Sequence, residues 1–276
     1  MKKTFLFGFA LSAISISSFA QTDTLFVNNQ KIACVVKELT TDAVRYSYPN
    51  EDLVNTVYKN TVNKIIFKSG RVQTFAEATS FKKVNSADDY ENVTITGVES
   101  EVKGLYKLGE VSSKAVGTTA LANQERVKDR AYRKMKLQAA MMGGNIVYLT
   151  AQRTQGNVYG TEYQAASPTE TNLTGICYTS TLSSLEDLKK AIADRKEFGT
   201  FERFKLGGSD SNIKREEVYL NFSLKEIHDN NGIITLEGNL DGLTKVNKFL
   251  LAGITADHIS IFYRDKSTVY SYSLKL

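Results

Sequence analysis

Side chains suited to acid–base or nucleophilic chemistry are scarce in this chain. It has two histidines, His228 in a predicted turn and His258, which follows Asp257 at a predicted strand start, and neither belongs to a nucleophile motif. Neighbouring strand residues point to opposite faces of a sheet, so Asp257 and His258 are not expected to form a dyad. A carboxylate pair for glycoside hydrolysis is not constrained by sequence spacing and stays open. We therefore predict a protein that is not an enzyme and has no catalytic residues.

Sites for cofactors and metals are equally scarce. The glycine-rich stretch 207–209 lacks the lysine and the strand-to-helix context of a phosphate-binding loop. Asp88 and Asp89 are adjacent in a polar stretch, where carboxylates are usually solvated. No group of Cys and His has metal-ligand spacing, so we predict no cofactor and no metal site.

The two cysteines, Cys34 and Cys177, leave two alternatives open. In an exported chain they could form one disulfide between distant segments. Each also lies in a strand-like apolar run, where a free thiol packs as a small hydrophobic side chain.

Two surfaces are candidates for binding. The first is the outer face of a predicted helix, opposite its apolar stripe, with the basic residues Arg126, Arg130, Arg133 and Lys134. The alternative for this face is solvation without a partner. The second is an aromatic stripe across a predicted C-terminal hairpin, formed by Tyr263, Tyr270 and Tyr272, which could stack on sugar rings or pack across the strands.

The N-terminus predicts export. Lys2 and Lys3 precede an apolar run, and Ser18 and Ala20 stand where a signal peptidase expects small residues. We therefore predict a signal peptide at residues 1–20 and a periplasmic or secreted protein, with an uncut N-terminal anchor as the alternative. Removing Lys2 and Lys3 lowers the formal charge from +5 to +3, a mild excess that does not indicate nucleic acid. After the signal, no segment predicts a transmembrane span.

The sequence patterns around these side chains predict helices and strands that form an α+β fold of three parts. A small N-terminal β-barrel is expected at residues 21–80, because short runs rich in Val, Ile, Tyr and Phe predict strands at residues 31–39, 43–48, 53–58, 64–68 and 71–75. Alternation puts Ile32, Cys34 and Val36 on one inward face and Val44, Tyr46 and Tyr48 on another. A polar linker is expected at residues 79–91.

A central α/β module is expected at residues 92–180, with one long helix on an antiparallel sheet. The helix is predicted from Asn123, a good N-cap, to Met142, with Gly143 and Gly144 ending it. Its apolar stripe comprises Val127, Ala131, Met135, Ala139 and Met142. Strands are expected at residues 93–98, 105–111, 145–150 and 173–179, with loops at 112–122 and 154–171.

A connecting helix at residues 183–197 follows, because Ser183 and Glu186 form a capping box. The last part, residues 198–276, is expected to be a β-rich C-terminal domain. Asn231-Gly232 predicts a hairpin between strands 218–227 and 232–239, and a second hairpin joins strands 259–263 and 268–274.

Two weak resemblances accompany these patterns. The Asp23-Thr24-Leu25 start and the closing stretch Ile65 to Arg71 make residues 23–78 resemble a small SH3-like β-barrel of exported Bacteroidetes multi-domain proteins. The stretch Leu108 to Val111 and the helix–strand corner Lys136 to Leu149 make residues 92–180 resemble the α/β module of RcsF-like and YbjQ-like proteins. Gly144 stands where that module usually has Ala. Its characteristic disulfides cannot form inside these residues, because Cys177 is their single cysteine.

We therefore expect an exported cell-envelope protein without catalytic activity that acts in protein interaction or as a scaffold. The expected partner is another envelope protein, contacted through the basic helix face, or a glycan. The alternative is a protein that binds a glycan or peptidoglycan fragment with its C-terminal sheet. The resemblance to RcsF-like proteins implies envelope contacts and favours the first function.

Overall fold

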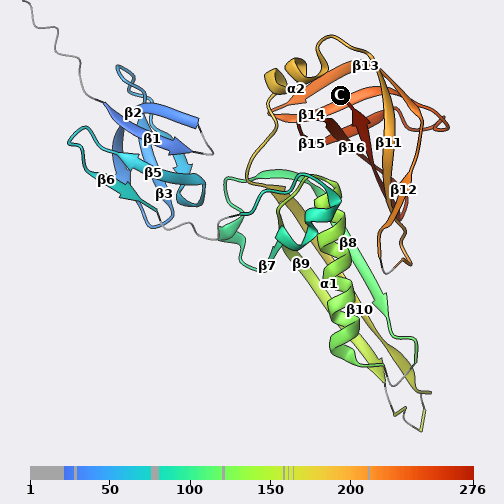
Figure 1. The fold of residues 1–276 in the computed structure, drawn as a ribbon. Helices are drawn as coiled ribbons and strands as arrows, with labels where there is room; N and C mark the ends of the chain where they lie inside the picture. Colours follow the sequence, from blue (N-terminus) through green and yellow to red (C-terminus); the bar gives the residue numbers. More distant parts are fainter. Residues whose placement is uncertain are drawn as a thin grey trace, which may run out of the picture.

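The computed structural model describes residues 22–27, 30–75, 81–119, 122–157, 159–160, 162–163, 165–210 and 212–276, so the predicted signal segment 1–20 lies outside the described residues. The protein is mostly β, with three sheets built from consecutive parts of the chain and few helices (Figure 1). This agrees with a β-rich α+β fold. Within the described ranges, no helix has both the length and the apolar character needed to cross a membrane.

The N-terminal sheet has six antiparallel strands in the order β4-β3-β2-β1-β5-β6. They are β1 (Asp23–Val27), β2 (Gln30–Leu39), β3 (Ala43–Ser47), β4 (Asn55–Tyr58), β5 (Val62–Ile66) and β6 (Val72–Thr74), with the 3-10 turn η1 (Lys59–Thr61) before β5. β1 was not among the predicted strands, although it pairs with both β2 and β5. β4 and β6 are the edges of this order, and closure into a barrel stays a prediction.

The predicted inward faces of the N-terminal sheet are largely confirmed. Cys34, Val44 and Tyr46 are buried in its core, and Ile32 and Val36 pack against it, whereas Tyr48 is 41% exposed. Tyr48 lies past the end of β3, where strand alternation no longer directs its side chain inward.

The central sheet has the order β7-β9-β10-β8. Its elements are the 3-10 helices η2 (Ala87–Asn92) and η3 (Glu99–Glu101) and the strands β7 (Thr94–Thr96), β8 (Tyr106–Val116), β9 (Ile146–Asn157) and β10 (Ser167–Thr179). β7 pairs with β9 in parallel, so the sheet is mixed rather than antiparallel as predicted. The polar stretch predicted as a linker includes η2, whose N-terminus is capped by Ser86 and Asp89.

The long helix α1 (Gln124–Met141) is confirmed with its caps. The side chain of Asn123 accepts a hydrogen bond from Arg126 N, and Gly143 follows the helix with a φ of +78°. The predicted apolar stripe is buried, which packs α1 on the sheet. The loops predicted beside it are shorter than expected, because β8 continues to Val116 and β9 and β10 extend into a long hairpin.

The C-terminal sheet forms a closed ring. Its elements are α2 (Leu185–Ile192), β11 (Glu197–Leu206), β12 (Lys214–Glu217), β13 (Asn221–Asn230), β14 (Ile233–Leu240), β15 (Lys248–Ile254), β16 (His258–Asp265) and β17 (Thr268–Lys275). The strand order β11-β13-β14-β15-β16-β17 is completed by pairing of β17 with β11. The ring encloses a core with Phe222, Phe249 and Tyr272, which Leu188 and Ile192 of α2 join. The N-cap of α2 is Ser184, one residue after the predicted Ser183.

The outer face of this ring packs against the central module. Phe204, Leu206, Phe262 and Val269 share one hydrophobic core with residues of α1, β8 and β10. Arg264 Nη2 donates a hydrogen bond to Glu110 O across the junction, at 2.8 Å. The predicted boundary between the central and C-terminal parts therefore does not separate two independent cores.

Candidate functional site

The predicted basic helix face is divided by the fold. Arg126 and Arg133 are exposed and Arg130 is partly buried, but Lys134 is only 2% exposed, so its assignment to an outward face was wrong. Lys134 Nζ donates a hydrogen bond to Gly208 O in the loop between β11 and β12. That loop covers this side of α1, which no pattern within the helix could indicate.

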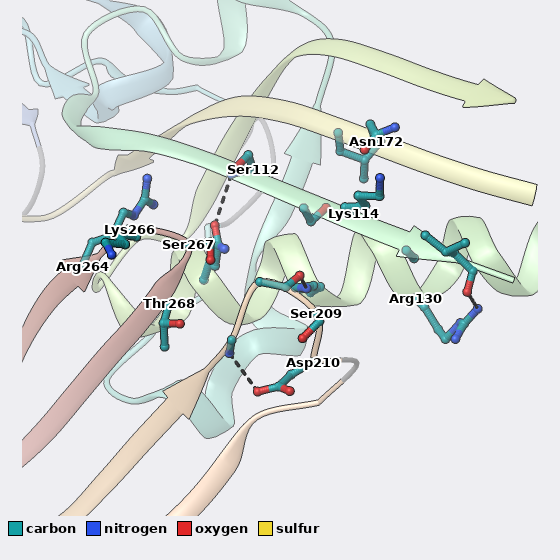
Figure 2. A pocket seen from close by; sticks show the side chains of 18 of the residues that line it. Ser112, Lys114, Arg130, Asn172, Ser209, Asp210, Arg264, Lys266, Ser267 and Thr268 are labelled. Carbon is teal, nitrogen blue, oxygen red and sulfur yellow. Dashed lines mark hydrogen bonds between the residues drawn. The ribbon is translucent and has the colours of Figure 1, made fainter. Parts of the chain in front are cut away.

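A pocket of about 980 Å³ opens beside Lys134, between the central module and the C-terminal ring (Figure 2). Its walls come from β8, α1, β10, the loop and strand at residues 205–214, and the hairpin at residues 264–268. In Figure 2, Arg264 and Lys266 lie toward one end and Lys114 and Arg130 toward the other. Among the described lining residues there are seven cations and one carboxylate, Asp210, the cations being Lys114, Arg130, Lys134, Lys205, Lys214, Arg264 and Lys266.

Polar contacts between α1 and β8 fix one wall of the pocket. Gln138 Oε1 accepts from Ser112 N at 3.1 Å, and Ser113 Oγ donates to Ala131 O at 2.7 Å. Arg130 Nη2 donates to Val116 O at 2.9 Å, so this guanidinium is tied to the end of β8. The first two contacts use buried or partly buried groups and hold α1 against β8, whereas the Arg130 contact is exposed.

The loop after β11 forms the opposite wall. Asp210 Oδ2 accepts a hydrogen bond from Gly207 N at 3.0 Å, which tightens the turn. Gly208 lies against the side chain of Ser267, where a Cβ would come within 2.8 Å of Ser267 Oγ. Burial lowers the pKa of Lys134, and the nearby carboxylate of Asp210 opposes that shift.

Several of the lining cations form no salt bridge. Lys114 is paired with Glu170 at 2.9 Å, and the pKa of Glu170 is lowered by hydrogen bonds from Asn172 and Lys114. Lys205, Lys214 and Lys266 have no ion-pair partner within the part of the chain that the structure describes. A hollow with an excess of positive charge attracts anions and concentrates them locally.

No family model, curated protein or solved structure matches this chain. The resemblances to the SH3-like barrel and to the RcsF-like and YbjQ-like module therefore stay predictions.

The predicted tyrosine stripe does not form a ligand surface. Tyr263 and Tyr272 are 6% and 2% exposed inside the ring, and Tyr270 is partly buried with its ring stacked on Tyr263 at 4.8 Å. Closure of the sheet turns this face inward, so cross-strand packing, the alternative considered from the sequence, accounts for the three rings. Stacking of Tyr263 and Tyr272 on a sugar is excluded by their burial.

Cys34 and Cys177 are free thiols. Cys34 lies in the core of the N-terminal sheet and Cys177 in the core shared by the central module and the ring. The disulfide is therefore not formed, and the alternative of two isolated buried thiols describes the structure.

The side chains of Asp257 and His258 were expected to point to opposite faces, and that reason for excluding a dyad was wrong, because the two side chains interact. His258 Nδ1 lies 3.0 Å from Asp257 Oδ1 and 2.9 Å from Thr255 Oγ1, and hydrogen bonds from Thr255 and His258 lower the pKa of Asp257. Asp257 precedes β16 in a bend, so strand alternation does not apply to it. Both contacts use the same ring nitrogen, whereas a catalytic relay needs one partner on each nitrogen.

Few features of the sequence indicate the pocket. The 207–209 stretch was judged only as a failed phosphate loop, and the turn at residues 264–267 only as a hairpin connection. Lys205 lies just before the first stretch, the turn contains Arg264 and Lys266, and Ser112 to Lys114 likewise combines a lysine with small polar residues. That shared composition of three separate segments was the available signal.

Proposed function

We propose that this chain is a non-catalytic binding protein of the cell envelope that takes a ligand with several carboxylate or phosphate groups into the basic pocket. The excess of cations over carboxylates in the lining supports this proposal most strongly. Three of these lysines lack an ionic partner among the described residues, so an anionic ligand would gain attraction without displacing an existing ion pair.

The ligand class that we favour is an acidic segment of another envelope protein. Lysine ammonium groups are point charges on flexible side chains. They can therefore follow several carboxylates along a peptide, and they are less suited to recognising a single planar group in a fixed orientation. The volume of about 980 Å³ lies near the upper end of pockets for small molecules, so it accommodates a short segment of chain. The proposed function is still protein interaction, as expected from the sequence. The proposed binding surface is now the pocket instead of the outer face of the helix.

An acidic glycan or peptidoglycan fragment is the second candidate. The hydroxyl groups of Ser112, Ser267 and Thr268 and the amide of Asn172 line the same pocket and suit sugar hydroxyls. No aromatic ring occurs among the described lining residues, so recognition would depend on charge and hydrogen bonds.

The test is a fluorescence-anisotropy titration of the mature protein with two labelled probes, a poly-glutamate peptide and an oligogalacturonate. The pocket variant is Lys214→Gln with Lys266→Gln, two exposed residues whose charge is lost with little change of shape. The control variant, Lys31→Gln with Lys37→Gln, removes the same charge from exposed positions of β2.

We expect the peptide to bind and the pocket variant to weaken its affinity by about tenfold, since each of the two charges contributes up to about 1 kcal/mol. The control variant should bind as the wild type does. Preference for oligogalacturonate would select the second candidate. Equal weakening by both variants would show that only net charge matters and would refute the pocket.

A further inference from the structure

A second cluster of chemically competent side chains lies on the outside of the C-terminal ring, on β13 and β14. Its members are Glu226, His228 and Glu237, and the candidate ligand atoms all lie within 4.8 Å of one another. His228 Nε2 is 3.1 Å from Glu237 Oε2 and 3.6 Å from Glu226 Oε2. None of the three lines the basic pocket.

A β-bulge creates this cluster. The pairing of β13 with β14 shifts register between Leu224 and Glu226, with Leu224 buried in the ring and Glu226 exposed. Without the extra residue, Glu226 would point inward like Leu224, because strand side chains repeat every two residues. The bulge instead puts Glu226 and His228 on the outer face, with Glu226 directly opposite Glu237.

The spacing of the three ligand atoms fits a small divalent ion. Ligands of tetrahedral zinc lie about 2.0–2.1 Å from the metal, which separates them by about 3.3–3.4 Å from each other. The distances of 3.1 and 3.6 Å from His228 Nε2 bracket that value, and the three ligand atoms all lie within 4.8 Å of one another. Two carboxylates and a neutral imidazole also balance the charge of the ion.

Two neighbours of Glu237 affect how it would bind a metal: Asn247 orients its carboxylate, and Lys248 competes for one of its oxygens. Asn247 Nδ2 donates to Glu237 Oε1 at 3.1 Å, which orients the carboxylate and leaves Oε2 facing His228. Lys248 Nζ lies 3.8 Å from Glu237 Oε2, where it competes with a metal for the same oxygen.

We propose that Glu226, His228 and Glu237 bind one Zn²⁺ ion, with water completing the coordination. The site is partly exposed, since the side chains of His228 and Glu237 are 39% and 24% accessible, which leaves room for that water. This inference is independent of the proposed function, because it uses no residue of the pocket.

Calorimetric titration of the mature protein with ZnCl₂ alone tests the site. The wild type should bind one equivalent, and His228→Ala should weaken binding by about tenfold or more, since it removes a direct ligand. The matched control is His258→Ala, which removes the other histidine and should leave the affinity unchanged. Lys248→Met should tighten binding several-fold, because it removes the competing cation.

Absence of Zn²⁺ binding by the wild type up to about 1 mM would overturn the proposal. Equal affinity of His228→Ala and the wild type would overturn it as well. Glu226→Gln provides a check on folding, since this exposed side chain can change without disturbing the ring, and it too should weaken binding.

Discussion

At the residue scale, the thiols of Cys34 and Cys177 show how burial lowers the reactivity of a cysteine. Both are buried in apolar cores, and burial raises the pKa of Cys34 to about 11 and that of Cys177 to about 12. The nearby Asp23 carboxylate adds to the shift at Cys34, whereas Arg264 opposes it at Cys177. Since the thiolate is the reactive form, both residues should be inert in the folded protein.

Titration with a disulfide reagent at about pH 8 tests this inertness, because an ordinary cysteine with a pKa of about 8.5 reacts there. We expect neither thiol to react in the native protein and both to react in guanidinium chloride. One or two rapidly reacting thiols in the native state would contradict the described burial.

The same pKa shifts predict how stability depends on pH. The folded state favours the neutral thiols, so their contribution is complete below the ordinary cysteine pKa and is lost as pH rises from about 9 toward 11 and 12. Urea unfolding across this range should show a falling free energy of unfolding. The variant Cys34→Ala with Cys177→Ala should lose part of this pH dependence, and an unchanged profile would count against the thiols as its source.

At the element scale, the predictable parts are those with a local signal. Helix α1 was predicted to within a residue or so at each end, because Asn123 and Gly143 mark its ends and its apolar stripe has helical spacing. The Asn231-Gly232 turn was also correct, with both residues at positive φ.

The missed elements lack such a signal. β9 continues through residues 151–157, which are polar and largely exposed, so no apolar alternation marks them as a strand. They are held instead by backbone pairing with β10. β1 is short, and its position between β2 and β5 depends on contacts far along the chain, including Asp23 accepting hydrogen bonds from Val36 N and Lys68 N.

The end of α1 gives an element-scale prediction. A Cβ on Gly143 would lie 2.0 Å from Ala252 O in β15, in addition to the strain of its positive φ. Gly143→Ala should therefore lower the free energy of unfolding by about 3 kcal/mol or more. Gly242→Ala is the control, since Gly242 has a φ of +80° with nothing within 4 Å, and should lose only about 1 kcal/mol.

Chemical denaturation followed by circular dichroism measures both glycine variants. Equal losses for Gly143→Ala and Gly242→Ala would mean that α1 does not pack closely on β15. Gly144 has its own constraint, because a Cβ there would lie 2.1 Å from Cys177 Sγ. This explains why Gly144 rather than Ala follows the helix here.

At the scale of the whole molecule, the pocket forms because the central module packs against the C-terminal ring. Its walls belong to different sheets that share one hydrophobic core, and Lys134 bridges them through Gly208. Each segment taken alone predicts a solvated strand, helix face or turn. The site could not be predicted from the sequence because its positive charge accumulates only when the central module and the C-terminal ring meet.

Hydrogen exchange measured by mass spectrometry, with and without a saturating poly-glutamate peptide, tests whether the pocket binds an acidic segment. We expect slower exchange in segments 112–116, 205–214 and 264–268, with no change in the N-terminal sheet. Protection confined to the N-terminal sheet or to the exposed side of α1 around Arg126 and Arg133 would contradict the pocket as the binding site.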